Sequence, residues 1–176
     1  FTNNGGNHTY TFNDNGEFTF EFVDKAGNVG TATVIVNWIA KLPKYEIHYS
    51  KTTVTNQDVK VVLELEDGYR IFNNNASKEY IFKENGTFEF QYKDKYGNDG
   101  FIPVTVDWID KEAPTATIEY NTTEPTKEPV IVTLRPSEEV TITNNDGKDT
   151  YTFNDNGEFT FEFVDKAGNI GSTTVV

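Results

Sequence analysis

The chain contains no cysteine, and this absence excludes several kinds of chemistry at once. Disulfide bonds, thiolate metal sites and cysteine nucleophiles all require that residue. Histidine occurs only at His8 and His48, and neither recurs at the matching positions of the internal repeats described below. The sequence also lacks a Gly-x-Ser-x-Gly elbow, a His-Glu-x-x-His pair and a phosphate-binding glycine loop. We therefore expect no enzymatic activity in these residues.

Long apolar runs and an excess of positive charge are absent as well. No stretch approaches the length of a membrane span, so we expect no membrane insertion by this part of the protein. The 15 lysines and arginines are outnumbered by 28 aspartates and glutamates, and the net charge is −13. Such a charge repels nucleic acid and anionic membrane surfaces, which excludes nucleic acid as a partner. Methionine is missing too, and we expect the chain to be a piece of a longer protein.

The sequence does contain a long internal repeat. Residues Thr9–Asn28 recur without change as Thr150–Asn169, and Tyr80–Asn98 is a divergent third copy. The copies begin about 70 residues apart, a spacing too long for a helical or leucine-rich repeat and suited to a small all-β module. An enzyme needs one site, whereas an array repeats a shape. The repeat therefore favours a stalk or a string of binding modules.

Within each repeat, apolar and polar residues alternate in short runs. Examples are Ala116-x-Ile118-x-Tyr120, Val130-x-Val132-x-Leu134 and Phe159-x-Phe161-x-Phe163. Period-two alternation is typical of strands with one face on a core, so each phenylalanine of the last run should be buried. An Asn-Gly pair precedes that run in every copy, and we expect it to form a tight reversal. An Asp-Lys-x-Gly-Asn sequence follows the run, and we expect it to form a turn with a left-handed glycine.

Proline-containing stretches divide the repeats. Trp38–Pro43 and Trp108–Pro114 match each other and read as short, stiff linkers. The predicted domains are a half repeat at 1–41, a full repeat at 42–111 and another at 112–176.

One candidate metal site lies in the second linker. Asp107, Asp110 and Glu112 stand within six residues of each other, and calcium prefers carboxylate and carbonyl oxygens. A solvated acidic linker is the alternative interpretation. Calcium is therefore the only cofactor that the sequence suggests.

The two tryptophans, Trp38 and Trp108, stand at the same position of their repeats. Exposed indole rings can stack on sugars, which would suit a glycan-binding module. Packing as a plug between the core of a module and its neighbour is the interpretation we favour, because large aromatic side chains are generally buried.

The glycine turn before an aromatic strand, the Asp-Lys-Ala-Gly-Asn turn and the Trp-Ile-Asp-Lys-x-Ala-Pro junction resemble bacterial immunoglobulin-like repeats. That family occurs in tandem in secreted and wall-anchored proteins, including adhesins and multi-modular glycoside hydrolases. The resemblance implies an all-β fold of tandem immunoglobulin-like β-sandwich modules, located at the bacterial cell surface or secreted. It also implies a structural spacer whose partners are the neighbouring modules. The alternative is an adhesin or carbohydrate-binding module that holds a glycan or host protein with its sandwich-end loops.

The half repeat 1–41 raises a separate expectation. It carries core-facing aromatics such as Tyr10, Phe12 and Phe20, but only the last four strands of a repeat. An open apolar face drives association. We expect this segment to be completed by an upstream piece or by another chain, which includes self-association.

Overall fold

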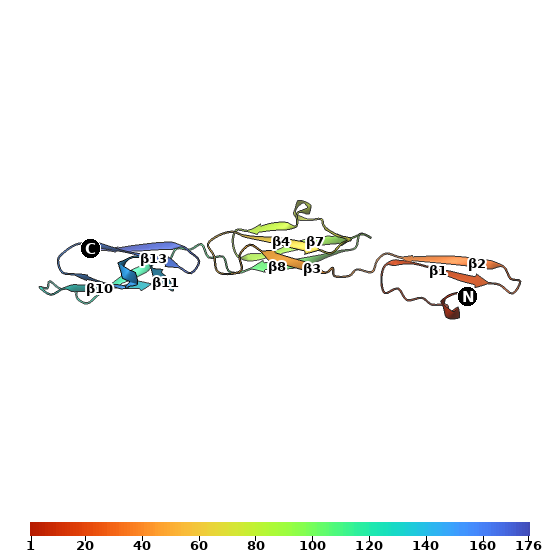
Figure 1. Ribbon diagram of the computed structural model, residues 1–176, viewed down its shortest axis with the longest axis horizontal. Coiled ribbons are helices and arrows are strands. Elements are labelled where there is room, and N and C mark those ends of the chain that lie inside the picture. The colour runs from red at the N-terminus through yellow and green to blue at the C-terminus, as the bar shows by residue number, and fades with distance from the viewer. The chain divides into compact units, whose positions relative to one another are not determined.

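The protein is built almost entirely from β-strands, as the alternation predicts. The computed structural model describes residues 1–176, and its sheets are small and antiparallel (Figure 1). The strands are β1 (Gly16–Val23), β2 (Val29–Val36), β3 (Tyr45–Tyr49), β4 (Val59–Leu65), β5 (Tyr69–Ile71), β6 (Glu79–Phe82), β7 (Gly86–Asp94), β8 (Asp99–Val106), β9 (Ala116–Tyr120), β10 (Val130–Pro136), β11 (Val140–Ile142), β12 (Thr150–Phe153), β13 (Phe159–Asp165) and β14 (Ile170–Val175). Three short helical turns complete it: η1 (Asn4–Gly6), η2 (Asn74–Ala76) and η3 (Asn145–Gly147). No helix has the length and apolar character of a membrane span.

Contacts along the chain define two compact units. Unit 1 comprises residues 1–47, 63–78 and 88–104, and unit 2 comprises residues 48–62, 79–87 and 105–176. These units are discontinuous along the chain and do not correspond to the three consecutive domains expected from the repeat. The limits of those domains remain a prediction.

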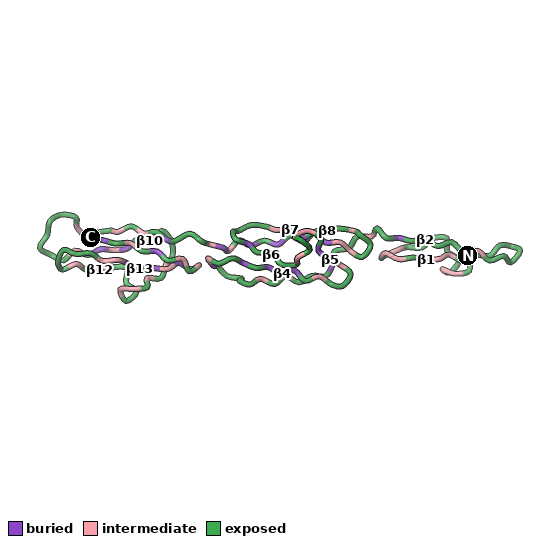
Figure 2. Tube along the Cα trace, turned by 90° about the horizontal axis from the view of Figure 1, so that it is seen from above, coloured by how far each residue is buried: buried purple, intermediate pink, exposed green.

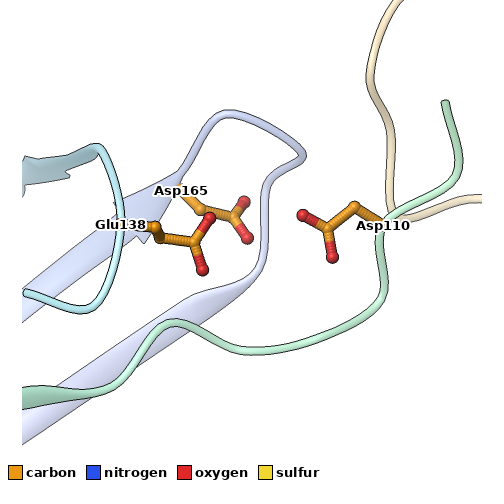
Figure 3. Close-up of side chains that lie close together, drawn as sticks. All are labelled: Asp110, Glu138 and Asp165. Carbon is orange, nitrogen blue, oxygen red and sulfur yellow. The ribbon is translucent and has the colours of Figure 1, made fainter.

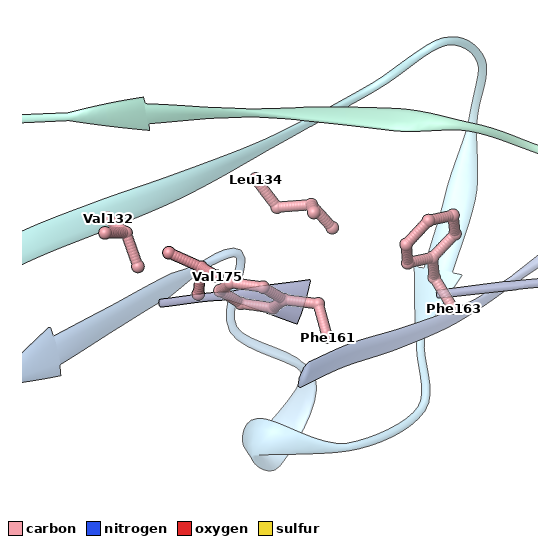
Figure 4. Close-up of a cluster of buried hydrophobic side chains, with 5 residues drawn as sticks. All are labelled: Val132, Leu134, Phe161, Phe163 and Val175. Atoms are coloured by element: carbon pink, nitrogen blue, oxygen red, sulfur yellow. The ribbon is translucent and has the colours of Figure 1, made fainter. Parts of the chain in front are cut away.

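The third repeat lies wholly in unit 2 and forms two layers. One sheet has the order β12-β10-β9 and the other the order β11-β13-β14. Between them lies a core of five buried side chains, two from β10 and three from β13 and β14 (Figure 4): Val132, Leu134, Phe161, Phe163 and Val175. Burying one such side chain contributes roughly 1.5–3 kcal/mol, so this cluster holds the two sheets together.

Strand β13 shows how the alternation produces that core. Phe161 and Phe163 are completely buried, whereas Glu162 between them is exposed. Phe159, at the start of the strand, is half-buried and stacks on the ring of Tyr151. Gly171 lies opposite Phe163 in the ladder, and a β-carbon there would collide with the Phe163 ring. Glycine at this position therefore leaves room for the phenylalanine.

The second repeat supplies two further three-stranded sheets, with the orders β3-β4-β6 and β5-β7-β8. In β7 the buried residues are Phe90 and Tyr92, and in β8 they are Ile102, Val104 and Val106. Both strands thus bury every second residue. The sequence alternation was the correct guide to these strands.

The first repeat contains only one hairpin, in which β1 pairs with β2 from Gly16↔Val36 to Val23↔Val29. No residue of β1 is buried (Figure 2). The expectation of four strands here is wrong, because residues 9–12 form no strand. The identical residues 150–153 form β12 by pairing with β10, and no strand equivalent to β10 stands beside residues 9–12. Tertiary pairing, rather than local sequence, decides this element.

The turns divide into one predicted type and one unpredicted type. Gly27, Gly97 and Gly168 all have positive φ in the Asp-Lys-x-Gly-Asn turn, as expected. The Asn-Gly pairs behave differently, because the glycines at 16, 86 and 157 are not left-handed. Positive φ instead occurs in the consecutive residues of η1, η2 and η3. Runs of left-handed residues are unusual for L-amino acids, so strong local contacts must hold them.

Candidate functional site

The centre of the candidate site is Asp165, which the turn after β13 positions. Its Oδ1 accepts hydrogen bonds from the backbone N–H groups of Gly168 and Asn169, at 2.7 and 2.8 Å. Its Oδ2 accepts one from the Asn169 side chain at 2.8 Å. Burial raises the pKa of Asp165, but these hydrogen bonds outweigh it and hold the pKa below the ordinary value of 3.8. The side chain is therefore ionised at neutral pH and primarily shapes its own turn.

Two further carboxylates approach Asp165. Glu138 comes from the loop between β10 and β11, and Asp110 comes from the linker that precedes β9 (Figure 3). Carboxylate oxygens of the three residues lie within 4.8 Å of one another. Glu138 is exposed, Asp110 is half-buried and Asp165 is buried. All three belong to unit 2, so the cluster is a feature of one compact unit.

The repulsion between the carboxylates of the cluster is reflected in the pKa of Glu138. Loss of hydration raises the pKa of Glu138, and the negative charges of Asp110, Asp165 and Glu112 raise it further. A divalent cation would relieve this repulsion. Calcium takes six to eight oxygens, however, and Asp165 already accepts three hydrogen bonds. The cluster can supply part of a calcium shell, with water completing it.

The predicted calcium ligands fall in different places. Asp110 lies in the cluster, and its Oδ1 also accepts a hydrogen bond from the Glu112 backbone at 3.1 Å. Glu112 is close enough to raise the pKa of Glu138 but is not among the three clustered carboxylates. Asp107 is exposed and lines a shallow hollow with Trp108 and Lys83. Spacing along the linker could not reveal Glu138 and Asp165, because a different loop and turn supply them.

A second recurrent feature fixes each linker to its repeat. The side chain of Asn15 donates to the Ile39 carbonyl at 2.8 Å and accepts from the Ile39 N–H at 2.7 Å. Asn85 forms the same pair of bonds with Ile109, at 2.8 and 2.7 Å. The asparagine of the Asn-Gly pair thus holds a linker residue as a neighbouring strand would. This contact, and not a reversal at the glycine, is the role of the pair.

The second linker has additional anchors. Residues Thr55 and Ile109 form a parallel bridge, in which Thr55 donates to the Trp108 carbonyl and accepts from the Asp110 N–H. The Trp108 indole N–H donates to the carbonyl of Lys51 at 3.1 Å. The second linker is therefore held by the backbone of Thr55 as well as by the side chain of Asn85.

Two of the Asp-Lys-x-Gly-Asn turns also make a contact at a linker, one with the residue just before the first linker and one within the second. Asn98 donates to the Asn37 carbonyl at 3.0 Å, and Asn169 donates to the Asp110 carbonyl at 3.0 Å. The same amide groups also bind the aspartate of their own turn. These two turns thereby combine a closed internal structure with a donor that reaches a preceding segment, whereas Asn28 of the first turn donates to Asp24 of its own turn.

Sequence reasoning missed a third recurrent motif, the Asn-Asn pair at the start of each left-handed turn. Asn144 donates to the Thr160 carbonyl at 2.7 Å and accepts from the Glu162 N–H at 3.1 Å. Asn3 and Asn73 form equivalent bonds with β1 and β7. The signal was present in the sequence, since an Asn-Asn pair stands at the same position of every repeat.

The two tryptophans have different surroundings. Trp108 packs edge-to-face on Tyr49 of its own repeat with ring centroids 5.4 Å apart, and packing of its ring against a neighbouring repeat stays a prediction. Trp38 is 68% exposed, so the packing expectation is wrong at this position. His8 contacts only the ring of Phe1 among the aromatic side chains, at 4.7 Å.

Comparison with protein-family models and with curated proteins finds no match. The site must therefore be interpreted from its own geometry.

Proposed function

We propose that this chain is a non-catalytic structural spacer, made of immunoglobulin-like repeats, in an extracellular or surface protein of a bacterium. It would hold an adhesive or catalytic module at a set distance from the cell wall. The location outside a bacterial cell rests on the sequence resemblance. The spacer role rests on what the recurrent residues do.

The observation that carries the proposal is the anchoring of the linkers. Asn15 and Asn85 each use both hydrogen-bonding groups of the amide on one linker residue. A buried or half-buried hydrogen bond contributes roughly 0.5–1.5 kcal/mol, and two per linker restrict its movement. A binding array would instead repeat exposed side chains on its loops. In this chain the repeated polar side chains, Asn15 and Asn85, instead form hydrogen bonds with the backbone of the linkers.

Spin labels test whether the linker is stiff. Two cysteines, replacing Lys60 on β4 and Glu162 on β13, can be labelled specifically because the chain has no cysteine of its own. We expect a narrow distribution of label distances in pulsed EPR. Asn85→Ala should broaden it, since the Ile109 backbone loses both bonds. The matched control is Asn156→Ala, an exposed residue at the same position of its repeat.

A broad distribution in the unmodified chain would contradict a spacer role. So would an Asn85→Ala variant whose distances and Ile109 amide exchange match those of the Asn156→Ala control.

Exposure of the Trp38 indole supports a second candidate function, the binding of a glycan by stacking. Titration with oligosaccharides while tryptophan fluorescence is followed tests it. A response that disappears in Trp38→Ala and persists in Trp108→Ala would favour the binding module. An unchanged spectrum with a panel of cell-surface glycans would eliminate it.

Calcium is the cofactor that we propose for the acidic cluster, where it would offset the charges of Asp110, Glu138 and Asp165. Calorimetric titration with calcium is the test, with Asp110→Asn as the site variant and Asp107→Asn as the matched control. Heat that is lost only in Asp110→Asn supports the site. No heat at millimolar calcium, or equal loss in both variants, contradicts it.

A further inference from the structure

The outer face of the sheet β5-β7-β8 in the second repeat differs chemically from the matching face of the third repeat. Phe72 is 41% exposed and Phe101 is 59% exposed, and the third repeat has Thr143 and Ser172 at these positions. Buried residues precede Phe72 and flank the exposed residues of β8, so both rings lie on the side of the sheet away from the core. The second repeat therefore carries two aromatic rings on a surface that is polar in its neighbour.

The two rings lie in one row across the sheet. The Phe72 N–H donates to the Gln91 carbonyl of β7 at 3.0 Å. On the other side of β7, the ion pair of Lys93 and Asp99 places Phe101 opposite Gln91, and the third repeat has the same register at the matching residues. Adjacent strands are about 4.8 Å apart, so the α-carbons of the two phenylalanines are roughly 10 Å apart. The exposed side chain of Gln91 lies between them and forms no hydrogen bond.

Two cations lie beside this row. Arg70 stands directly opposite Lys93, whereas the third repeat has uncharged residues at both positions. Like charges directly opposite each other on neighbouring strands are destabilising. Asp99 offsets Lys93 at 3.5 Å, but Arg70 forms no ion pair, unlike Arg135, which binds Glu119 at 2.6 Å. In a chain of net charge −13, this unpaired guanidinium is complementary to an anion, and arginine binds carboxylates through two parallel hydrogen bonds.

The dimensions of the face favour a glycan over a protein. Three strands span only about 10 Å between the outer two, whereas a stable protein interface buries about 800 Å² on each partner. A peptide could add to the open edge of β8, but Pro103 in that strand has no N–H to donate. Sugars present C–H faces that stack on aromatic rings and hydroxyl groups that bind amides. A narrow face of rings, a free amide and a guanidinium suits an extended acidic glycan.

We propose that this face, made of Arg70, Phe72, Gln91, Lys93 and Phe101, binds a glycan that carries carboxylate groups. Sugar rings lie against the two phenylalanines, a hydroxyl group binds the amide between them, and a carboxylate binds the guanidinium. The inference is independent of the spacer role and of the exposed Trp38 indole, because it rests on residues that only the second repeat has.

Calorimetric titration of the full 176-residue chain with uronic-acid oligosaccharides is the test. Oligomers of galacturonate, glucuronate and mannuronate are the probes, and we expect at least one of them to bind. Its methyl ester keeps the sugar rings but loses the charge, so it should bind at least about tenfold more weakly. Poly-glutamate keeps the charge but has no sugar rings to lie against the phenylalanines, and it should also bind at least about tenfold more weakly.

Variants with the residues of the third repeat locate the site. Arg70→Thr and Phe101→Ser should each weaken binding at least about tenfold. Arg135→Thr is the matched control for charge, because this arginine already has a partner. Ile81→Thr is the matched control for apolar surface, since Ile81 is 53% exposed on the other sheet of the repeat. Both controls should bind as the parent chain does, and amide exchange in β7 should confirm that all four variants fold.

Several results would overturn the proposal. One is the absence of binding by the folded parent chain at millimolar concentrations of all three oligosaccharides. Another is equal binding of the methyl ester, or unchanged binding in Arg70→Thr. Poly-glutamate that binds as tightly as the sugar, with no effect of Phe101→Ser, would assign the face to an acidic peptide instead. Binding that is lost in Trp38→Ala and kept in Arg70→Thr would place the glycan at the tryptophan.

Discussion

Phenylalanine-to-alanine substitution at two positions with identical local sequence separates the contribution of covering strands from that of the hairpin itself. Phe161 and Phe20 occupy the same place in residues 150–169 and 9–28. Phe161 is completely buried under Val132 and Leu134, whereas Phe20 is half-buried and touches the rings of Phe1 and Phe18. The two variants therefore change the same side chain in two environments.

The expected magnitudes differ several-fold. Truncation of a fully buried phenylalanine removes its transfer free energy and leaves a cavity, at a cost of roughly 3–5 kcal/mol, which we expect for Phe161→Ala. Phe20 loses less buried area and leaves an open surface that water can fill. For Phe20→Ala we expect about 1 kcal/mol.

Hydrogen exchange resolved by segment is the suitable assay, because the chain has more than one compact unit and a single melting transition would mix them. Protection of the amides in β13 and β14 should fall by the larger amount in Phe161→Ala. Protection in β1 and β2 should fall by the smaller amount in Phe20→Ala. Equal losses at the two sites would refute the reasoning, since they would mean that the strand pair of residues 116–136 adds nothing to the burial of Phe161.

Two other substitutions test backbone conformation and close packing. Ala76 has a φ of 60°, where the equivalent residues of the other two repeats are glycines. A left-handed backbone costs an alanine roughly 1–2 kcal/mol, and glycine avoids this cost. Because the unfolded chain has more conformational entropy with glycine, part of that advantage is lost, and Ala76→Gly should raise the free energy of unfolding in urea by about 0.5 kcal/mol. A loss of stability would mean that η2 is not left-handed in solution. Gly171→Ala should destabilise β13 and β14 by at least about 2 kcal/mol, because the new β-carbon meets the Phe163 ring and the rigid backbone carbonyl of Pro114. Chemical unfolding of the third repeat measures it, and a neutral result would show that the ring can move aside.

The sequence was sufficient to predict burial and turn conformation wherever these depend on residues that are close together along the chain. The alternation of Phe161, Glu162 and Phe163 predicts their burial correctly, and the glycine of the Asp-Lys-x-Gly-Asn turn has the left-handed φ expected of it. These features follow from residues that are close in sequence. They do not depend on which segment packs on top.

The sequence was insufficient where distant segments decide the outcome. Tyr151 belongs to a strand and Tyr10 does not, although the surrounding residues are the same, because only one has a partner strand. The Asn-Gly pair predicts a reversal from propensity alone, but Asn85 has a distant partner in Ile109. The acidic cluster is similar, since Glu138 joins Asp110 through the packing of a loop and not through spacing along the chain.

The stability of the third repeat should depend on pH through two carboxyl groups whose pKa values are shifted in opposite directions, Asp165 and Glu138. The pKa of Asp165 lies below its ordinary value in the folded protein, so its stabilising contribution is present above the unfolded pKa of about 4 and is lost as pH falls through the folded pKa. The pKa of Glu138 is raised, first by lost hydration and then by Asp110 and its other acidic neighbours. The folded state therefore binds the Glu138 proton more tightly, and stability rises as pH falls through that raised pKa.

Stability of β13 and β14 should consequently pass through a maximum in mild acid, between the titrations of Glu138 and Asp165. Unfolding by urea from pH 3 to pH 7, followed by segment-resolved hydrogen exchange, is the measurement. Glu138→Gln should raise stability at pH 7, because a neutral amide no longer repels Asp110 and Asp165, and it should flatten the curve on the neutral side of the maximum. The acid side should stay unchanged in that variant, since the hydrogen bonds of Asp165 remain. Calcium at neutral pH should act in the same direction as Glu138→Gln if the cluster holds the ion, and the two effects should not add. A Glu138→Gln variant that is less stable than the parent at pH 7 would mean that this carboxylate is stabilised rather than repelled by its surroundings, which would also remove the electrostatic reason for placing a cation there.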